Sequence, residues 1–275
     1  MGQINSEMFA KKKDTDLMIH IVGGSGIIGL HLKQRFQGRE KLFVQEKGNW
    51  NFSSILRDDF VFYLRSVSSP FKVMSDPEGS REINVIKTKK AISEILSVGA
   101  RIVFASSDVV YGDTQNSIVD EETPINPYGE YAIQKASVEE DFRNERNFLT
   151  LRISSVVGEG SNLRKLLRNQ EVVEIFDPVI RTPIHVNDLG TLCCKLVNKD
   201  FRENFPNGVL NAGGKTCLSN FEVAVLEAKY LGVNRPMVSQ RTAEDEACRP
   251  ATVCMATKKA QKFANLSLDL AEHYE

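Results

Sequence analysis

The chain has 275 residues, of which 41% are hydrophobic and 26% charged, values typical of a folded globular protein. Its formal net charge of −1 does not favour nucleic acid, and no apolar run reaches the roughly 18 residues that a membrane span needs. Five cysteines without a CxxC pair and four scattered histidines predict free thiols, a cytoplasmic protein and no metal site. We expect the polar residues 1–16 to form a flexible tail.

A strand, a glycine-rich turn and a helix are predicted in succession after this tail. Residues 17–22 form an apolar run typical of a buried parallel strand, and residues 30–36 carry apolar side chains at helical spacing. The GxxGxxG motif between them permits a tight turn, the approach of a pyrophosphate to the backbone and close packing of helix on strand. It therefore predicts a dinucleotide site at the helix N-terminus. The residues assigned to this site are Gly23, Ser25, Gly26, Ile27, Ile28 and Gly29.

Two further buried strands are predicted at residues 41–45 and 60–64. Glu46 follows the first strand, near the offset at which an acid binds the adenosine ribose of NAD, whereas its neighbour Lys47 suits the 2′-phosphate of NADP. The choice between NAD and NADP therefore stays open. Because only a short segment separates the two strands, the strand and helix that usually intervene must be short or missing.

The loop after the strand at 60–64 is a candidate ligand site. Open α/β sheets bind ligands outside the carboxyl ends of their strands. We therefore assign Leu64 and Arg65 to the cofactor and Ser66 to the substrate. The apolar spacing then predicts a helix over 83–98.

A serine, a tyrosine and a lysine form the most specific pattern of the chain. A predicted strand ends in the sequence SSDVVYG, whose second serine is Ser107. The helix predicted over 129–146 carries Tyr131 and Lys135 four residues apart, so both side chains lie on one helical face. Tyr128 competes as the phenol, but alanine rather than lysine stands four residues after it. Ser107 lies 24 residues before the YxxxK pair, behind the GxxGxxG motif.

These motifs resemble the short-chain dehydrogenase/reductase superfamily, in the extended NAD-dependent epimerase/dehydratase branch that modifies nucleotide sugars. The resemblance covers roughly residues 17–265 and includes an LRxxxxxG segment, RTPIHVNDL and a C-terminal RP pair. It implies a Rossmann-type, doubly wound parallel α/β sheet with a smaller C-terminal substrate-binding region. The implied Rossmann domain comprises residues 17–154 and 186–214, and the substrate-binding region 155–185 and 215–275.

The resemblance also implies roles for individual side chains. Ser107, Tyr131 and Lys135 would be catalytic, and the last two would also contact the cofactor, NADP or NAD. Asn84 would brace the backbone of the active site beside that cofactor. The residues implied in binding a nucleotide-diphosphate sugar are Ser66, Ser107, Asp108, Ser154, Ser155, Arg181 and Arg249. In relatives, the helices corresponding to 83–98 and 129–146 pair with a second copy, which implies a homodimer.

The implied chemistry is alcohol–ketone interconversion on a bound sugar. A phenol titrates near pH 10, and a protonated Lys135 together with an oxidised nicotinamide is expected to lower the pKa of Tyr131. Tyr131 would then exchange a proton with the sugar oxygen, to which Ser107 donates a hydrogen bond, while hydride moves to or from the cofactor.

The branch of the family depends on further acid–base groups. Val109 stands where 4,6-dehydratases carry glutamate and where epimerising reductases carry cysteine, and no histidine lies near Gly160. This favours a 4-keto reductase similar to the dTDP-4-dehydrorhamnose reductases. A nucleotide-sugar 4-epimerase remains the alternative, because no acid–base group separates the two. A second alternative is a non-catalytic NAD(P)-binding subunit, since a fold does not fix a function.

Overall fold

The structure is a computed structural model that describes residues 18–38, 42–45, 51–115, 117–198, 205–240 and 243–274. The predicted tail, Glu46 and Lys47 lie outside these residues. No helix in the described ranges combines the length and the apolar character needed to span a bilayer.

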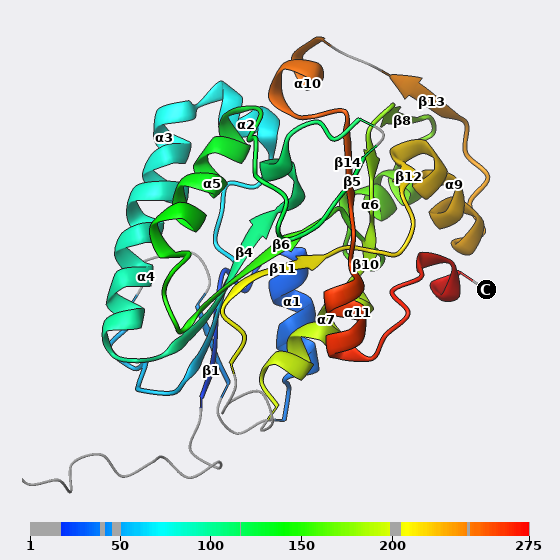
Figure 1. The fold of residues 1–275 in the computed structure, drawn as a ribbon. Helices are drawn as coiled ribbons and strands as arrows, with labels where there is room; N and C mark the ends of the chain where they lie inside the picture. The colour runs from blue at the N-terminus through cyan, green and yellow to red at the C-terminus, as the bar shows by residue number, and fades with distance from the viewer. Residues whose placement is uncertain are drawn as a thin grey trace, which may run out of the picture.

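A six-stranded, all-parallel sheet lies at the centre of the molecule (Figure 1). The inner strands β1, β3, β4 and β6 are buried on both faces, which explains their largely apolar sequences, whereas Phe43 on the edge strand β2 is 39% exposed. The strand order is β11-β6-β4-β3-β1-β2, so the direction of winding reverses between β1 and β3. The strands are β1 (Ile19–Val22), β2 (Leu42–Gln45), β3 (Phe60–Tyr63), β4 (Arg101–Ser107), β6 (Phe148–Ile153) and β11 (Gly208–Ala212).

The predicted doubly wound Rossmann-type fold is confirmed, because helices cover both faces of this sheet (Figure 1). One face carries α1 (Ile27–Arg35), α7 (Val186–Leu196) and α11 (Lys258–Ala264). The other face carries α4 (Thr88–Ser97) and α5 (Glu130–Phe142). Residues 51–59 contain no strand, in agreement with the short connection expected between β2 and β3.

The helix predicted over 83–98 begins earlier than expected. It runs through α3 (Pro77–Arg81), the π-helical turn η2 (Glu82–Lys87) and α4. Asp76 caps its start, because the Asp76 carboxylate accepts a hydrogen bond from Gly79 N at 3.0 Å. The short α2 (Pro70–Ser75), capped by Ser69, precedes it and was not predicted.

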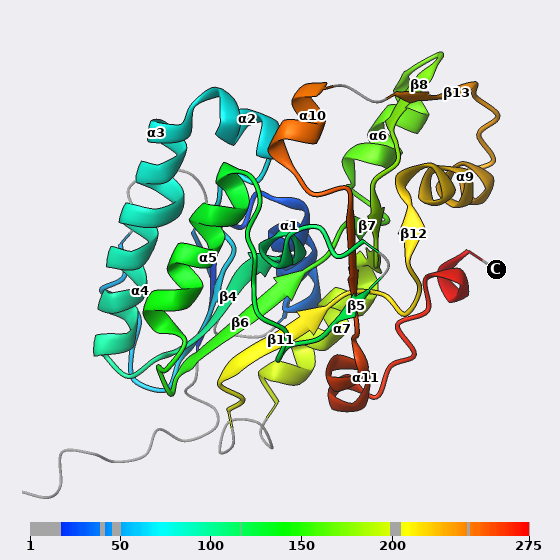
Figure 2. The ribbon, with the colours of Figure 1, turned by 45° about the horizontal axis from the view of Figure 1, so that its top comes forward.

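The C-terminal region packs against one end of the main sheet and is built from short elements (Figure 2). Its helices α6 (Asn162–Asn169) and α9 (Asn220–Tyr230) share an apolar cluster with the parallel pair β8 (Val173–Phe176) and β13 (Met237–Gln240). The other short elements of the described chain, from its middle as well as its C-terminal part, are η3 (Asp108–Tyr111), β5 (Ile118–Val119), β7 (Val156–Val157), β9 (Ile180–Arg181), β10 (Ile184–His185), β12 (Leu218–Ser219), α10 (Ala243–Cys248), β14 (Thr252–Met255) and η4 (Leu270–His273).

Two cysteines of this region are joined. Cys217 and Cys254 form a disulfide with a Cα–Cα distance of 5.8 Å, whereas Cys193, Cys194 and Cys248 are free. The expectation of free thiols is therefore wrong for this pair. Its cause is tertiary, because β12 and β14 flank the same strand, β9, and bring together residues that are 37 positions apart.

Candidate active site

A cavity of about 860 Å³ lies at the carboxyl ends of the central strands, where the C-terminal region covers them. Ligands of doubly wound sheets bind at this place, because the chain leaves neighbouring strands in opposite directions and opens a crevice. The pocket contains most of the predicted site residues. Those that line it are Gly23, Ser25, Gly26, Ile27, Ile28, Gly29, Leu64, Ser66, Ser107, Asp108, Tyr131, Lys135, Ser154, Ser155, Arg181 and Arg249.

The three glycines of the GxxGxxG turn after β1 have different structural roles. Gly23 has φ +100°, and a Cβ there would lie 2.9 Å from the backbone nitrogen of Arg65. A Cβ on Gly29 would lie 2.5 Å from the carbonyl oxygen of Gly23, so this glycine allows α1 to pack against the turn. A Cβ on Gly26 would find nothing nearer than 3.9 Å, and Gly26 caps α1 without a side chain. The first turn of α1 therefore presents its backbone to the pocket, which fits a pyrophosphate.

Two predicted cofactor residues lie behind the pocket surface. Arg65 is not among the described residues that line it, and its side chain forms a hydrogen bond with the phenol of Tyr63. Asn84 is 3% exposed on the π-helical turn. Its Oδ1 accepts from Val67 N at 2.7 Å, while its Nδ2 donates to the Val67 carbonyl at 3.1 Å and to Gln134 Oε1 at 2.8 Å. Asn84 thus ties the loop after β3 to α5.

The Ser107, Tyr131 and Lys135 side chains converge on the pocket from two elements. Ser107 ends β4 and caps η3, and Tyr131 and Lys135 lie in the first turns of α5. Lys135 Nζ donates to the carbonyl oxygen of Ala105 at 2.6 Å and lies 5.8 Å from the centre of the Tyr131 ring. The helical spacing of the YxxxK pair therefore places both groups at the carboxyl end of β4, as the sequence predicts.

Burial controls the protonation of these two groups. It raises the pKa of Tyr131, a hydrogen bond with Ser66 opposes this rise, and the Asp108 carboxyl adds to it. The shift is opposite to the expected lowering by Lys135. Burial also lowers the pKa of Lys135 to about 8, although the carboxylate of Glu139 opposes that change. At neutral pH the phenol therefore retains its proton and Lys135 its charge.

A buried ion pair joins the strands and the helix that surround Lys135. Arg152 Nη2 lies 2.7 Å from Glu139 Oε2, and both side chains are at most 7% exposed. The Ser106 hydroxyl donates to the same carboxylate. Because these residues belong to β6, α5 and β4, the pair fixes the three elements that carry the candidate catalytic groups.

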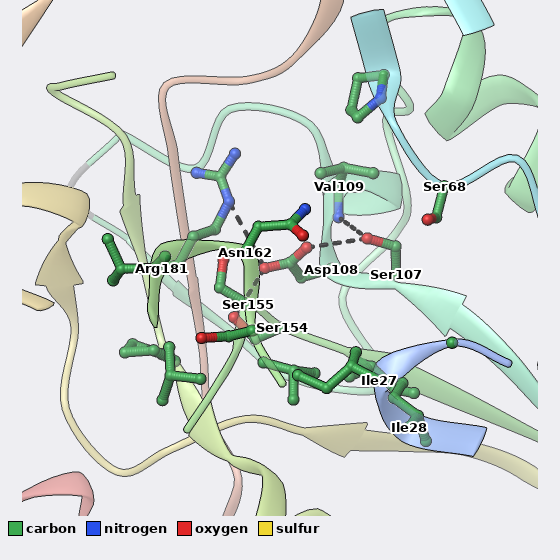
Figure 3. A pocket seen from close by; sticks show the side chains of 18 of the residues that line it. Ile27, Ile28, Ser68, Ser107, Asp108, Val109, Ser154, Ser155, Asn162 and Arg181 are labelled. Atoms are coloured by element: carbon green, nitrogen blue, oxygen red, sulfur yellow. Dashed lines mark hydrogen bonds and ion pairs between the residues drawn. The ribbon is translucent and has the colours of Figure 1, made fainter. Parts of the chain in front are cut away.

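The Asp108 carboxyl lies in the middle of a second buried cluster (Figure 3). Ser154 donates to its Oδ2 at 2.9 Å, Ser107 to its Oδ1 at 3.1 Å, and Arg181 Nε lies 3.6 Å from Oδ2. Burial raises the pKa of Asp108, and the Arg181 guanidinium and the two hydroxyls only partly offset this.

Arg181 is 4% exposed, and its guanidinium is directed at the protein itself. Besides Asp108, it donates to the carbonyl oxygens of Ile180, Ala251 and Pro250 at distances between 2.7 and 2.9 Å. The geometry thus joins Arg181 to the pocket wall and uses most of its hydrogen-bonding capacity there. The resemblance implied a contact between Arg181 and the nucleotide-diphosphate sugar. The RTPIHVNDL motif alone does not show that residues 250–251 lie beside Arg181 and accept its hydrogen bonds.

The opposite wall of the pocket contains the expected Arg249, whose guanidinium covers the Phe176 ring at 4.5 Å. Two side chains of this wall were not predicted: Lys165 and Asn162, which reach the pocket from α6. The i, i+3 spacing of Asn162 and Lys165 beside a leucine-rich face would have indicated a shared helical face. Ser155 lies exposed near them, on the segment between β6 and β7.

The sheet order, the glycine-rich turn at the point of reversal and the pocket above it define a Rossmann-type protein with a nucleotide-sized site. The profile of the RmlD substrate binding domain matches residues 17–272. The chain therefore belongs to the RmlD substrate-binding domain family, which confirms the resemblance to dTDP-4-dehydrorhamnose reductases.

Solved structures share this fold over nearly the whole chain. A dTDP-4-dehydrorhamnose reductase of Clostridium acetobutylicum has a TM-score of 0.78 at 18% identity, covering 92% of this chain and 94% of that one. MoeE5 in complex with UDP-glucose and NAD has a TM-score of 0.77 at 20% identity and 91% and 93% coverage. A Bacillus anthracis dTDP-4-dehydrorhamnose reductase in complex with NADP has 0.77 at 19% identity and 91% and 92% coverage.

The curated relatives match a smaller part of the chain. Methionine adenosyltransferase 2 subunit beta of Pongo abelii is 27% identical over 204 residues, which cover 62% of this chain and 59% of that protein. The match to the rat protein of the same name covers 49% of its length. The chain therefore spans between about half and three fifths of the length of these relatives.

Proposed function

We propose that the protein reduces the 4-keto group of a nucleotide-linked (6-deoxy) sugar, with NADPH or NADH as the hydride donor and Tyr131 as the proton donor. The observation that carries this proposal is the convergence of Ser107, Tyr131 and Lys135 on one pocket with the glycine-rich turn. The family membership supports it, because the neighbouring structures include dTDP-4-dehydrorhamnose reductases.

The glycine-rich turn supports the cofactor assignment. The open side of Gly26 and the first turn of α1 would hold the pyrophosphate, and Leu64 would lie against the remainder of the cofactor. A nicotinamide held there would supply hydride to the carbonyl carbon. Neighbouring structures contain NAD or NADP, so the preference between the two stays open in this proposal.

The protonation states favour reduction. Because its pKa is raised by burial, Tyr131 carries the proton that a carbonyl oxygen needs when it becomes a hydroxyl. Ser107 is placed to donate a hydrogen bond to that oxygen. Lys135, charged at neutral pH, offsets the negative charge that Tyr131 acquires as it loses the proton. An enzyme that begins by oxidising a hydroxyl would need the phenolate instead, which the charge of an oxidised nicotinamide would favour.

The substrate is proposed to lie across both regions. Its sugar would contact Ser66, Asp108 and Ser154 near the catalytic groups. Its diphosphate would contact Arg249, and Lys165 is better placed than Arg181 to share that role, because Arg181 already donates to three carbonyl oxygens.

The test is to mix the purified protein with NADPH or NADH and a nucleotide-linked 4-keto-6-deoxy sugar. Oxidation of the cofactor in a one-to-one ratio with the sugar supports the reductase. Interconversion of two nucleotide sugars without net use of cofactor would support a 4-epimerase instead. Failure of both reactions, with the cofactor tightly bound, would contradict catalysis.

That last outcome would favour a second candidate, a non-catalytic NAD(P)-binding subunit. The specific observation in its favour is the match to proteins named as beta subunits of a methionine adenosyltransferase. Retention of Ser107, Tyr131 and Lys135 in one pocket weighs against it.

We also propose a cytoplasmic homodimer. Ile86 on η2 and Ile133 on α5 are 52% and 45% exposed, and both lie on the helices expected to pair with a second copy. An apolar contact between copies would remove this surface from water.

A further inference from the structure

The inner end of the pocket, where Ser107 and Tyr131 lie, contains the Asp108 carboxyl beside several hydroxyls. Asp108 is 3% exposed, next in the chain to Ser107, and close enough to Tyr131 for its charge to raise the pKa of that phenol. If the sugar oxygen that reacts lies between Ser107 and Tyr131, as proposed above, the sugar ring must lie beside the Asp108 carboxyl (Figure 3). A sugar hydroxyl can donate a hydrogen bond to this group.

The cations of the inner end are engaged by the protein. Arg181 faces Asp108 and donates to the carbonyl oxygens of Ile180, Ala251 and Pro250. Lys135 donates to the carbonyl oxygen of Ala105. Among the described residues that line the pocket, the remaining cations are Arg249 and Lys165, which belong to the outer wall formed by the C-terminal region.

A second carboxylate would therefore be poorly accommodated beside Asp108. Arg181, whose Nε lies 3.6 Å from Asp108 Oδ2, favours the charged form of Asp108 against the rise in its pKa that burial causes. A second carboxylate would lose water in a buried site, face this charge and find the nearest guanidinium already paired. We propose that Asp108, held in place by Ser154 and Arg181, makes the pocket select nucleotide-linked neutral sugars and reject nucleotide-linked uronic acids. This inference rests on the proposed function and adds a specificity-determining residue to it.

The test compares UDP-glucose with UDP-glucuronic acid, which differ only in the carboxylate at C6. Binding of each to the full chain is measured by calorimetry in the presence of NADPH. We expect UDP-glucuronic acid to bind at least about tenfold more weakly, because a like charge at close range costs more than the energy of one tenfold step. Equal or tighter binding of UDP-glucuronic acid overturns the inference.

The variant Asp108→Asn removes the charge and releases Arg181 Nε for the sugar carboxylate. We expect the affinity ratio between the two ligands to narrow by about tenfold. The matched control is Glu174→Gln, which removes the same charge at an exposed position of the same pocket and leaves the ratio unchanged, because water screens it. An unchanged ratio in Asp108→Asn overturns the role of Asp108.

These outcomes separate the two proposals. Oxidation of the cofactor by a nucleotide-linked 4-keto-6-deoxy sugar decides the proposed function, whereas equal binding of the two UDP-sugars, or binding of neither, overturns this inference alone. The ratio in the unmodified protein needs no variant, so the inference stays falsifiable if Asp108→Asn does not fold.

Discussion

The two walls of the pocket are built in different ways. The wall from the main sheet consists of buried strands and long helices, and its side chains are fixed by interior contacts such as the Glu139–Arg152 pair and the Asn84 hydrogen bonds. The wall from the C-terminal region consists of strands of two to four residues and the helices around them, and it contributes partly exposed side chains such as Arg249 and Lys165. Under the proposed function, this difference assigns the reaction to the first wall and the choice of substrate to the second, with Asp108 and Arg181 at their junction.

The sharpest test of this division is Tyr131→Phe. Loss of the phenolic proton should lower kcat by about 10²–10⁴-fold, because the variant lacks its general acid. The dissociation constants of NADPH and of the nucleotide sugar should stay close to those of the unmodified protein, as measured by fluorescence and calorimetry. Retention of full turnover would contradict the role of Tyr131.

A matched pair of glycine substitutions separates binding from folding within the first wall. Gly26→Ala places a methyl group in open space at the pyrophosphate position, so NADPH affinity should fall by about tenfold while the melting temperature is unchanged. Gly29→Ala drives a Cβ into the backbone of the turn and should cost about 1–3 kcal/mol of unfolding free energy. Equal thermal stability of the two variants would count against this assignment.

On the second wall, Arg249→Met should act on substrate affinity alone. Methionine keeps an apolar stem over Phe176 but removes the charge, and a hydrogen bond to a charged group contributes about 1.5–3 kcal/mol. The KM for the nucleotide sugar should rise by about tenfold or more, with kcat and NADPH affinity unchanged. A fall in kcat equal to the rise in KM would show that the walls are not independent.

The pH dependence of kcat/KM tests whether the reaction needs the positive charge of Lys135. Its pKa is lowered from 10.5 to about 8, so its charge is lost as the pH rises through 8. The pKa of Tyr131 is shifted in the opposite direction, upward, so Tyr131 keeps its proton over this range. We expect kcat/KM to be constant below about pH 8 and to fall about tenfold for each further unit. In Lys135→Arg this fall in kcat/KM should begin at higher pH. If it begins at the same pH as in the unmodified protein, the titration of another group causes it.

The smallest effect on turnover is expected on the outer face of α5. Ile133→Lys places a charge on an exposed apolar position that is not among the described residues lining the pocket. The variant should change a dimer into a monomer by light scattering without changing kcat. A monomeric unmodified protein would exclude the proposed homodimer.

The sequence predicted the first wall better than the second, for a physical reason. Buried parallel strands such as Phe148–Ile153 need continuous apolar sequences, and helical geometry alone puts Tyr131 and Lys135 on one face. These are local relations, visible in a short stretch of chain.

The C-terminal region depends on contacts between distant segments. β9 and β14 pair across about 70 residues, and that pairing sets Ala251 and Pro250 beside Arg181. The Cys217–Cys254 disulfide has the same origin. Burial, which raises the pKa of Tyr131, is likewise a tertiary effect that the YxxxK spacing does not show.

The π-helical turn at Glu82–Lys87 has a consequence for how the protein can evolve. A π turn holds one residue more than the regular helix around it, and it places Asn84 where both the Val67 backbone and Gln134 can be reached. Deleting one residue there would restore a regular helix with its flanking turns in their present phase, but would withdraw Asn84 from its hydrogen bonds to Val67 and Gln134. Length changes are usually tolerated near the surface, but in this helix even a single-codon deletion would detach the loop that carries Ser66.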